Sequence, residues 1–335
     1  MVTLASEASE AAAGAARQIA TVGDALDEIV RRVRHRPPTF VVTCARGSSD
    51  HAAMYGKYLL ETTVGCAVAS VGPSIVSTYG RTPNLDGALF IAVSQSGKSP
   101  DLVQLTTAAR AAGAIVVGMI NDAASPLAAE CDVVVPLCAG EEQSVAATKS
   151  FLLSCLAFLQ LAARWTDDAA LHDAVVRTPD ALAAATALAW PLDHLASATS
   201  LYVVGRGVGL SAALEIALKL KETTRLHAEA FSTAELRHGP IALVEPGFPV
   251  LALGQDDRTR PSVIETITLL VQLGADVMST LPIAGTRSLP TVAAPAVIAP
   301  LCHVLACYLA LPALARARGL DADAPTHLSK VTRTI

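Results

Sequence analysis

The sequence contains an internal repeat, and this repeat limits the folds that the chain can adopt. Residues 201–207 (LYVVGRG) match residues 41–47 (VVTCARG), so a second copy follows the first at an offset of 160. Residues 250–255 match residues 90–95 at the same offset, and a Gly-Ala pair recurs one residue beyond it at 274–275. A chain of 335 residues is long enough to bury two cores. We therefore predict two similar domains that arose by duplication.

Apolar runs alternate with helical segments in each copy, as in a parallel sheet covered by helices. The run at residues 88–93 is continuous and is typical of a strand buried on both faces. Further strands of the first copy are predicted at residues 40–44, 67–71, 115–120 and 133–135. We predict the α/β class, with two tandem domains that each form a three-layer, flavodoxin-like or Rossmann-like sandwich. The first domain is expected at residues 1–165, and linker helices with the second domain at residues 166–335.

Small and hydroxyl-bearing residues follow two of the predicted strands in the first copy. Residues 45–50 (ARGSSD) lead from a strand into a helix, and residues 94–101 (SQSGKSPD) do the same after the next buried run. Free backbone N–H groups and hydroxyls at a helix start suit a phosphate. The second copy has GQDD at residues 254–257, where the first copy has SQSG. We therefore expect only the first copy to hold a phosphate at this loop.

Residues 215–240 are crowded with acids and bases, although the chain as a whole is only 16% charged. Lys219 and Glu222 lie one turn apart on a predicted helix and share a face. A salt-bridged surface helix is the ordinary explanation of such a pair. His238 precedes a Gly-Pro break, which places its ring on a turn. A carboxylate beside a cation also suits proton transfer between adjacent carbons of an open-chain sugar.

The motifs KLKE, HAEAF and ELRHGP in this segment resemble the second sugar-isomerase (SIS) domain in the isomerase half of glucosamine-6-phosphate synthase. Relatives that deaminate amino-sugar phosphates share the pattern, and the likeness covers most of the chain. It implies that Glu222 shuttles a proton between C1 and C2, that Lys219 assists, and that His238 opens the sugar ring in a neighbouring subunit. A catalytic lysine of the family tail matches Lys330, within HLSKVT.

The resemblance also implies contacts to the sugar phosphate. These are expected at Ser48, Ser49, Ser94, Gln95, Ser96 and Ser99, with Glu142 and Val145 near the sugar. The sequence departs from the family pattern at Arg46, Asp50, Lys98, Ala147 and Ala234. These departures favour a relative with a different substrate or reaction direction.

Our first hypothesis is a deaminase and isomerase that converts an amino-sugar 6-phosphate, such as glucosamine 6-phosphate, to fructose 6-phosphate and ammonia. The synthase needs a glutaminase domain that begins with a nucleophilic cysteine, whereas this chain begins with Met1. We therefore do not expect glutamine to be the nitrogen donor. Two alternatives stay open: an aldose–ketose isomerase or deglycase acting on another sugar phosphate, and a sensor that binds a sugar phosphate without catalysis. No helix-turn-helix segment is evident for the sensor.

Composition and missing motifs narrow the partners. The formal net charge of -5 and the lack of a basic stripe argue against nucleic acid. No metal-binding spacing is present, and no complete dinucleotide fingerprint follows a strand, so neither a metal nor a cofactor is expected. The seven cysteines form no CxxC pair and indicate a reducing compartment. With no secretory signal at the N-terminus, we expect a cytoplasmic protein.

Residues 289–315 contain no charged residue and are long enough to cross a bilayer. Four prolines divide the segment, so we predict instead a short strand and a helix of about three turns from Pro300, with no membrane partner. The linker at residues 166–198 is likewise expected to break at Pro179 and Pro191. Because 52% of the residues are hydrophobic, surplus apolar surface and the His238 turn favour a homodimer with shared active sites.

Overall fold

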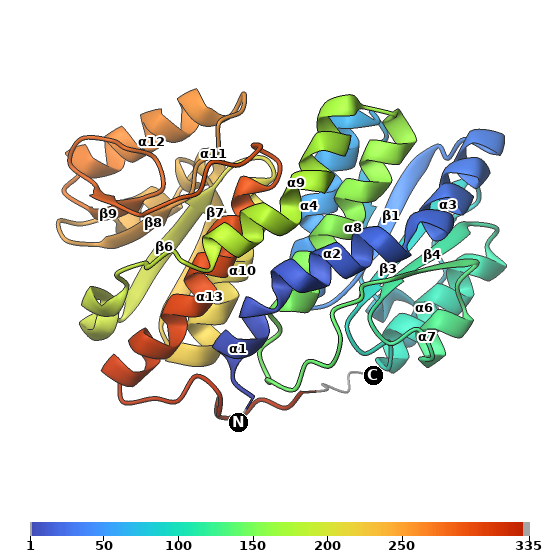
Figure 1. Ribbon diagram of the computed structural model, residues 1–335, viewed down its shortest axis with the longest axis horizontal. Coiled ribbons are helices and arrows are strands. Elements are labelled where there is room, and N and C mark those ends of the chain that lie inside the picture. The colour runs from blue at the N-terminus through green and yellow to red at the C-terminus, as the bar shows by residue number, and fades with distance from the viewer. Residues whose placement is uncertain (1, 331–335) are drawn as a thin grey trace. The chain divides into compact units, whose positions relative to one another are not determined.

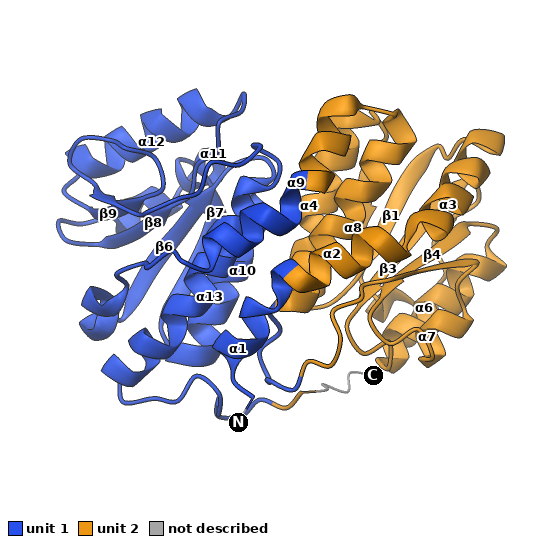
Figure 2. Cartoon of the chain, viewed as in Figure 1, with its two compact units in different colours: residues 1–12, 143–148, 177–328 blue, residues 13–142, 149–176, 329–335 orange. Residues whose placement is uncertain are grey.

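The computed structural model describes residues 2–330, which form two compact units (Figure 2). Unit 2 consists of residues 13–142, 149–176 and the end of the chain from Ser329. Unit 1 consists of the start of the chain up to Ala12 and residues 143–148 and 177–328. Each unit is built around one five-stranded sheet whose strands are all parallel.

The sheet of unit 2 has the strand order β2-β1-β3-β4-β5, and β1, β3 and β4 are labelled in Figure 1. Its strands are β1 (Phe40–Cys44), β2 (Val68–Ser70), β3 (Ala88–Ser94), β4 (Ile115–Ile120) and β5 (Val133–Pro136). The accompanying helices are α2 (Ala11–Thr21), α3 (Gly23–His35), α4 (Ser48–Thr63), α5 (Ser74–Ser77), α6 (Pro100–Ala111), α7 (Pro126–Ala129) and α8 (Lys149–Thr166). Every residue of β3 is buried, as expected for the central strand of a sheet that is covered on both faces.

The sheet of unit 1 has the order β10-β9-β8-β6-β7. Its strands are β6 (Ser200–Gly205), β7 (His227–Ser232), β8 (Pro249–Ala252), β9 (Asp276–Ser279) and β10 (Arg287–Ser288). The helices are α1 (Leu4–Ser9), α10 (Gly209–Thr224), α11 (Thr233–Leu236), α12 (Arg260–Gln272) and α13 (Ala299–Ala317), with 3-10 turns η1 (Asp193–Ser197) and η2 (Pro240–Leu243). A further helix, α9 (Ala169–Ala185), has residues in both units.

Strand register supports the duplication that the sequence suggests. Val42 of β1 pairs with Phe90 of β3, and 160 residues later Tyr202 pairs with Val250. Val250 also pairs with Val277 of β9, which lies 161 residues beyond the β4 partner of Phe90. Both sheets run in the same flavodoxin-like order when read from β2 and from β7. The predicted fold class is therefore confirmed.

Two prolines do not break helices in the way that the sequence suggests. Pro179 lies inside α9, and Pro312 lies inside α13, which runs for 19 residues rather than about three turns. The expected short strand before Pro300 is also absent among the described residues, since the last strand ends at Ser288. Most of α13 is buried, and it packs along α10. In α13, this packing offsets the backbone hydrogen bond that Pro312 removes.

The helix α13 is also the one helix of the described chain that is long and apolar enough to span a membrane. Of the most apolar stretch within it, 72% is buried inside the protein. Leu301, Leu305 and Leu311 are almost fully buried in unit 1. The apolar character of α13 is thereby accounted for by core packing.

Candidate functional site

The two serine-bearing loops of unit 2 begin at neighbouring strands. One loop joins β1 to α4 and the other joins β3 to α6, and β1 pairs directly with β3. The strand order reverses between these two strands, and open α/β sheets bind ligands outside their carboxyl ends at such a point. Ser48 is the first residue of α4, and Ser99 immediately precedes α6. The predicted phosphate contacts are therefore brought to one edge of one sheet.

The loop after β3 is held in a tight conformation. Ser94 Oγ accepts a hydrogen bond from the backbone N–H of Gly97 at 2.9 Å, and Ser96 Oγ accepts one from Lys98 at 3.3 Å. Gly97 has a φ of 62°, and an added Cβ would lie 2.0 Å from Ser125 Oγ. Only glycine fits here without movement of the neighbouring chain. The serine hydroxyls thus shape the loop as well as lining it.

An ion pair joins the two loops. The guanidinium of Arg46 donates to Asp101 Oδ2 at 2.8 Å through Nη2 and at 3.3 Å through Nε. Asp101 is the second residue of α6 and is fully buried, whereas about half of the Arg46 side chain is exposed. From the sequence, Arg46 is assigned no role and is named as a departure from the family pattern. Its position shows that it fixes the first loop to the helix that follows the second.

Glu142 and Lys330, which are far apart in the sequence, meet within unit 2. Lys330 Nζ lies 3.3 Å from Glu142 Oε2. The buried Glu142 carboxylate also accepts hydrogen bonds from the backbone N–H of Ser150 at 3.2 Å and from its hydroxyl at 2.7 Å. These contacts hold the tail lysine at the start of α8.

The predicted acid and base of unit 1 are in direct contact on α10. Lys219 Nζ donates to Glu222 Oε2 at 2.5 Å. The same ammonium lies 3.5 Å from Glu215 Oε1, one turn earlier on the helix. Glu215 and Lys219 are essentially unexposed, whereas 20% of the Glu222 side chain is exposed. A buried ammonium between two carboxylates is stabilised in its charged form.

Tyr308 completes this network from a helix that is distant in sequence. Its hydroxyl donates to Glu215 Oε1 at 2.8 Å, and Tyr308 is fully buried on α13. The spacing of Glu215 and Lys219, four residues apart on one helix face, could have predicted their contact. Nothing in the sequence around Tyr308 indicates its partner. The network therefore has two members that the motif analysis did not assign.

His238 and Val145 lie in other parts of unit 1. His238 is exposed and borders a pocket of about 400 Å³ with Arg206 and Thr233. Val145 lies in the segment 143–148, which is anchored by a buried residue of α1. That residue is Glu7, whose carboxylate accepts hydrogen bonds from the backbone N–H groups of residues 143 and 144. No motif or residue spacing connects Glu7 with this loop.

Residues 2–330 contain no group of three His, Cys, Asp or Glu side chains that is placed to hold a metal ion.

A family assignment follows from the sequence match to these two sheets. Residues 40–164 and 194–293 match the SIS domain model, one segment for each unit's sheet. The chain belongs to the SIS family. The duplicated flavodoxin-like sheets are thus two SIS domains, and the predicted family is confirmed.

Several relatives of known name share this SIS architecture. The glutamine–fructose-6-phosphate aminotransferase (isomerizing) of Aeropyrum pernix is 34% identical over 313 residues, which cover 85% of this chain and 49% of that protein. The chain therefore spans about half the length of the curated relatives it matches. A Silicibacter pomeroyi DSS-3 protein proposed to be a phosphosugar isomerase is 40% identical, with a TM-score of 0.91 and coverage of 96% and 100% of the two chains.

A third likeness concerns the fold alone. The C-terminal domain of the glucosamine-fructose-6-phosphate aminotransferase of Francisella tularensis superimposes with a TM-score of 0.82 at 23% identity. The match covers 96% of this chain and 98% of that one. At this identity the likeness shows that the two chains share a fold, which agrees with the family match.

Proposed function

We propose that this SIS enzyme deaminates and isomerises an amino-sugar 6-phosphate, with glucosamine 6-phosphate as the first candidate. After ring opening, a base removes the proton from C2 and delivers a proton to C1, which leaves an imine at C2. Water then hydrolyses the imine, giving fructose 6-phosphate and ammonia. The chemistry needs a carboxylate base and a nearby cation, but no oxidant or reductant.

The contact between Lys219 and Glu222 carries this proposal. Of the two carboxylates around the buried ammonium, Glu215 is fully enclosed and is engaged by the Tyr308 hydroxyl. Glu222 is the partly exposed one, so a substrate can reach it. We assign Glu222 as the proton-transferring base and Lys219 as the cation that stabilises the negative oxygen of the intermediate.

The serine loops supply the complementary half of the proposal. Hydroxyls and helix N-termini at the carboxyl edge of the unit 2 sheet favour a phosphate group, and the sugar-contact roles of Gln95, Glu142 and Val145 remain predictions. We propose that the serine loops bind the phosphate group of the substrate. His238 is proposed to open the ring, and Lys330 to assist next to Glu142.

The decisive test measures both products across a panel of 6-phosphates of glucosamine, its epimers and its N-acetyl form. The proposal expects stoichiometric ammonia and ketose phosphate from at least one free amine. In deuterium oxide, the substrate should also exchange its C2 proton. Ketose formation from glucose 6-phosphate, without ammonia from any amino sugar, would instead establish an aldose–ketose isomerase.

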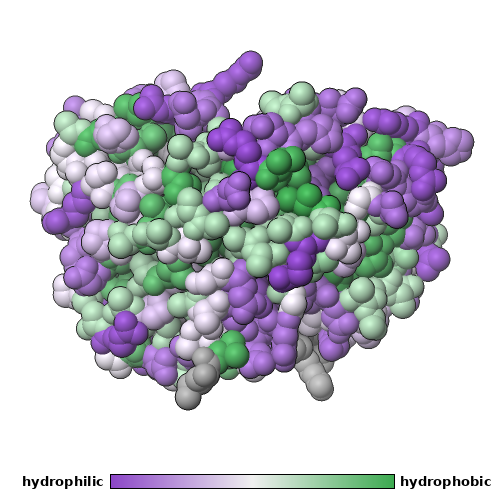
Figure 3. All heavy atoms as spheres, viewed as in Figure 1, coloured by the Kyte–Doolittle hydropathy of each residue, from purple (hydrophilic) through white to green (hydrophobic). Residues whose placement is uncertain are grey.

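We also propose a homodimer in which His238 serves the partner's site. Leu243, in the 3-10 turn that follows this histidine, is 65% exposed, which suits a contact surface. On the face shown in Figure 3, apolar residues are interspersed with hydrophilic ones rather than gathered over a single element. Mixing inactive His238→Ala and Glu222→Gln proteins should restore part of the activity after subunit exchange. No recovery after verified exchange would place both residues in one subunit's site.

A cytoplasmic location is proposed from the cysteines. All seven are free thiols, and burial raises the pKa of Cys44, Cys131 and Cys302 to about 12. Such protonated, buried thiols behave as small apolar side chains and suit a reducing compartment. Fractionation of cells that express the protein would test the location.

A further inference from the structure

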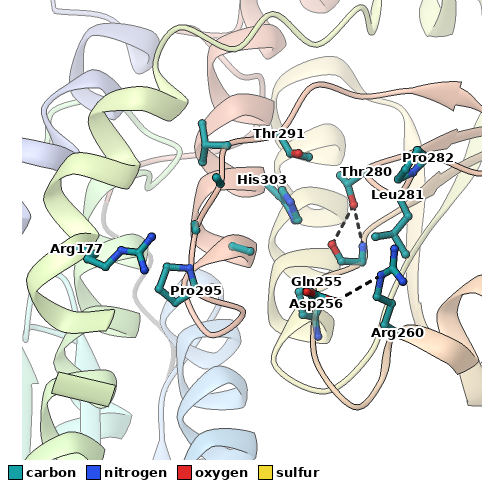
Figure 4. A pocket seen from close by; sticks show the side chains of 15 residues that line it. Arg177, Gln255, Asp256, Arg260, Thr280, Leu281, Pro282, Thr291, Pro295 and His303 are labelled. Atoms are coloured by element: carbon teal, nitrogen blue, oxygen red, sulfur yellow. Dashed lines mark hydrogen bonds and ion pairs between the residues drawn. The ribbon is translucent and has the colours of Figure 1, made fainter. Parts of the chain in front are cut away.

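The loop that replaces the serine loop in the second copy borders a pocket of about 710 Å³ within unit 1 (Figure 4). Gly254, Gln255 and Asp256 follow β8, and Thr280 follows β9, so the pocket lies at the carboxyl ends of two neighbouring strands. Open α/β sheets bind ligands at this edge. The volume also lies within the range of roughly 300–1,000 Å³ that is usual for small-molecule sites.

A buried histidine faces this pocket from the other side. His303 projects from α13 toward the strand ends (Figure 4), and only 3% of the residue is exposed. Among the described residues, its Nδ1 is buried and has no hydrogen-bond partner. Gln255 also lines the pocket, and its buried Oε1 likewise has no hydrogen-bond partner among the described residues. An unsatisfied buried polar atom costs roughly 1–3 kcal/mol, so its presence here indicates a partner that the chain itself does not supply.

The protonation state of His303 limits what that partner can be. Burial lowers the pKa of the imidazole to about 4, so the ring is neutral near pH 7. A neutral imidazole has one donor and one acceptor nitrogen, which suits a hydroxyl group better than an anion. Trp190 packs beside the ring, with the ring centroids 6.2 Å apart, and thereby fixes its position.

Two arginines in the pocket wall are positively charged, in contrast to the neutral imidazole of His303. Arg177 extends from α9 on one side and Arg260 from the start of α12 on the other (Figure 4). Arg260 Nε lies 3.6 Å from a carboxylate oxygen of Asp256, whose side chain is otherwise exposed. A guanidinium at a helix N-terminus suits a phosphate, because both the fork of N–H donors and the helix dipole favour an anion.

We propose that this pocket is a second ligand site, which binds a phosphorylated sugar or sugar alcohol with its phosphate at Arg260 and a hydroxyl at His303. The residues that line this pocket include none of the serine-loop residues and neither member of the acid/base pair on α10. The second site therefore does not depend on the reaction proposed above. The duplicated domain keeps the ligand-binding edge of the fold but holds its ligand through arginine and imidazole instead of serine.

Fluorescence of Trp190 gives a local test. The chain has two tryptophans, so a Trp165→Phe protein leaves Trp190, beside His303, as the single reporter. Glucitol 6-phosphate serves as the probe because it has no carbonyl group and cannot be isomerised. The full-length Trp165→Phe protein should show a saturable change in Trp190 emission on titration. An unchanged emission up to millimolar probe would overturn the proposal.

Two further variants in the same background localise the binding. Arg260→Gln should weaken the emission response about 10- to 100-fold in Kd, because a charged hydrogen bond to phosphate is lost. Arg287→Gln is the matched control, since Arg287 forms a comparable ion pair with Asp276 outside the pocket and should bind as the parent does.

A variant of the serine loop tests whether the probe binds in unit 2 instead of in the pocket of unit 1. Ser94→Ala/Ser96→Ala should leave the Trp190 response intact, even where it abolishes turnover. A response lost in that double variant but retained in Arg260→Gln would assign the binding to unit 2 and overturn the second site. That result would leave the proposed deaminase reaction untouched, whereas failed ammonia release would leave the second site untouched.

Discussion

The helices α4 and α10 follow equivalent strands of the two SIS domains and end in the same Glu-Thr-Thr sequence, yet their Lys/Glu pairs do different things. In α4, Lys57 and Glu61 are each about one-third exposed and bond each other and the backbone of Val68. In α10, Lys219 is buried between two carboxylates. The first pair ties a helix to an edge strand, and the second has the features of a chemical centre.

This comparison shows why local sequence alone does not distinguish the proposed catalytic pair from the structural one. Both pairs lie one turn apart, and both are surrounded by leucine. The difference comes from Glu215 and Tyr308, which enclose the ammonium of α10 and leave only Glu222 accessible. Duplication supplied two similar helices, but only in α10 is the lysine buried between two carboxylates.

Neutralising Glu222 in α10 and Glu61 in α4 should give the largest difference in turnover between variants of the two helices. Glu222→Gln keeps the shape and removes the basicity, so turnover should fall roughly 10²- to 10⁴-fold with little change in substrate binding. Glu61→Gln is the matched control and should leave kcat unchanged. Steady-state kinetics and the thermal midpoint of both proteins check the result. Normal turnover in Glu222→Gln would exclude this residue, and Glu235 would be tested next.

The loops after β3 and β8 extend the comparison to substrate binding. Charged hydrogen bonds contribute roughly 1.5–3 kcal/mol each, so Ser94→Ala/Ser96→Ala should raise KM by about 10²-fold or more. Asp256→Ala changes the equivalent loop of unit 1 at an exposed side chain and should leave KM within about twofold. Initial rates over a range of substrate concentrations separate these outcomes. The reverse result would move phosphate binding to the second copy.

The strands could be predicted from sequence because each buried strand of a parallel sheet is a continuous apolar run. The repeat was equally visible, down to the one-residue shift between β3 and β4 relative to β8 and β9. Helix interruptions were harder to predict. Pro312 is a helix breaker by local propensity, but burial of α13 against α10 overrides it.

The candidate site was predictable only where its members are close in sequence. Lys219 and Glu222 share one helical turn, so their contact follows from helix geometry. Contacts of Arg46 with Asp101, and of Tyr308 with Glu215, join different elements and depend on tertiary packing. No periodicity or motif encodes such a pairing, so these residues came only from the structure.

The pocket of unit 1 should also differ from the serine loop in its response to acid. Burial lowers the pKa of His303 from 6.5 to about 4 in the folded protein. As the pH falls, the imidazole is therefore protonated in the unfolded chain before it is protonated in the folded protein. The contribution of the neutral His303 to the free energy of unfolding should therefore be fully present above pH 6.5. It should be lost as the pH drops toward 4, which lowers the free energy of unfolding by up to about 3 kcal/mol. The charged groups that line the same pocket are Arg177, Asp256 and Arg260.

Chemical denaturation of the Trp165→Phe protein, followed by Trp190 emission at several pH values, measures this dependence. With His303→Gln added there is no titrating ring, so the unfolding free energy should change less than that of the Trp165→Phe parent between pH 6.5 and 4. The comparison uses the slope with pH, because the substitution can shift the absolute stability. Equal slopes in the two proteins would show that His303 does not carry the effect.

The smallest expected effect separates backbone strain from packing in the serine loop. Gly97 and Gly80 both have a φ near 60°, but an added Cβ meets Ser125 at Gly97 and nothing within 4 Å at Gly80. Gly80→Ala should lower the free energy of unfolding by about 1 kcal/mol through the left-handed backbone alone. Gly97→Ala should cost about 2 kcal/mol, because Ser125 must also move. Matched denaturation curves would show equal losses if the loop after β3 were loose, and such a loop would not hold its serine hydroxyls in place for a phosphate.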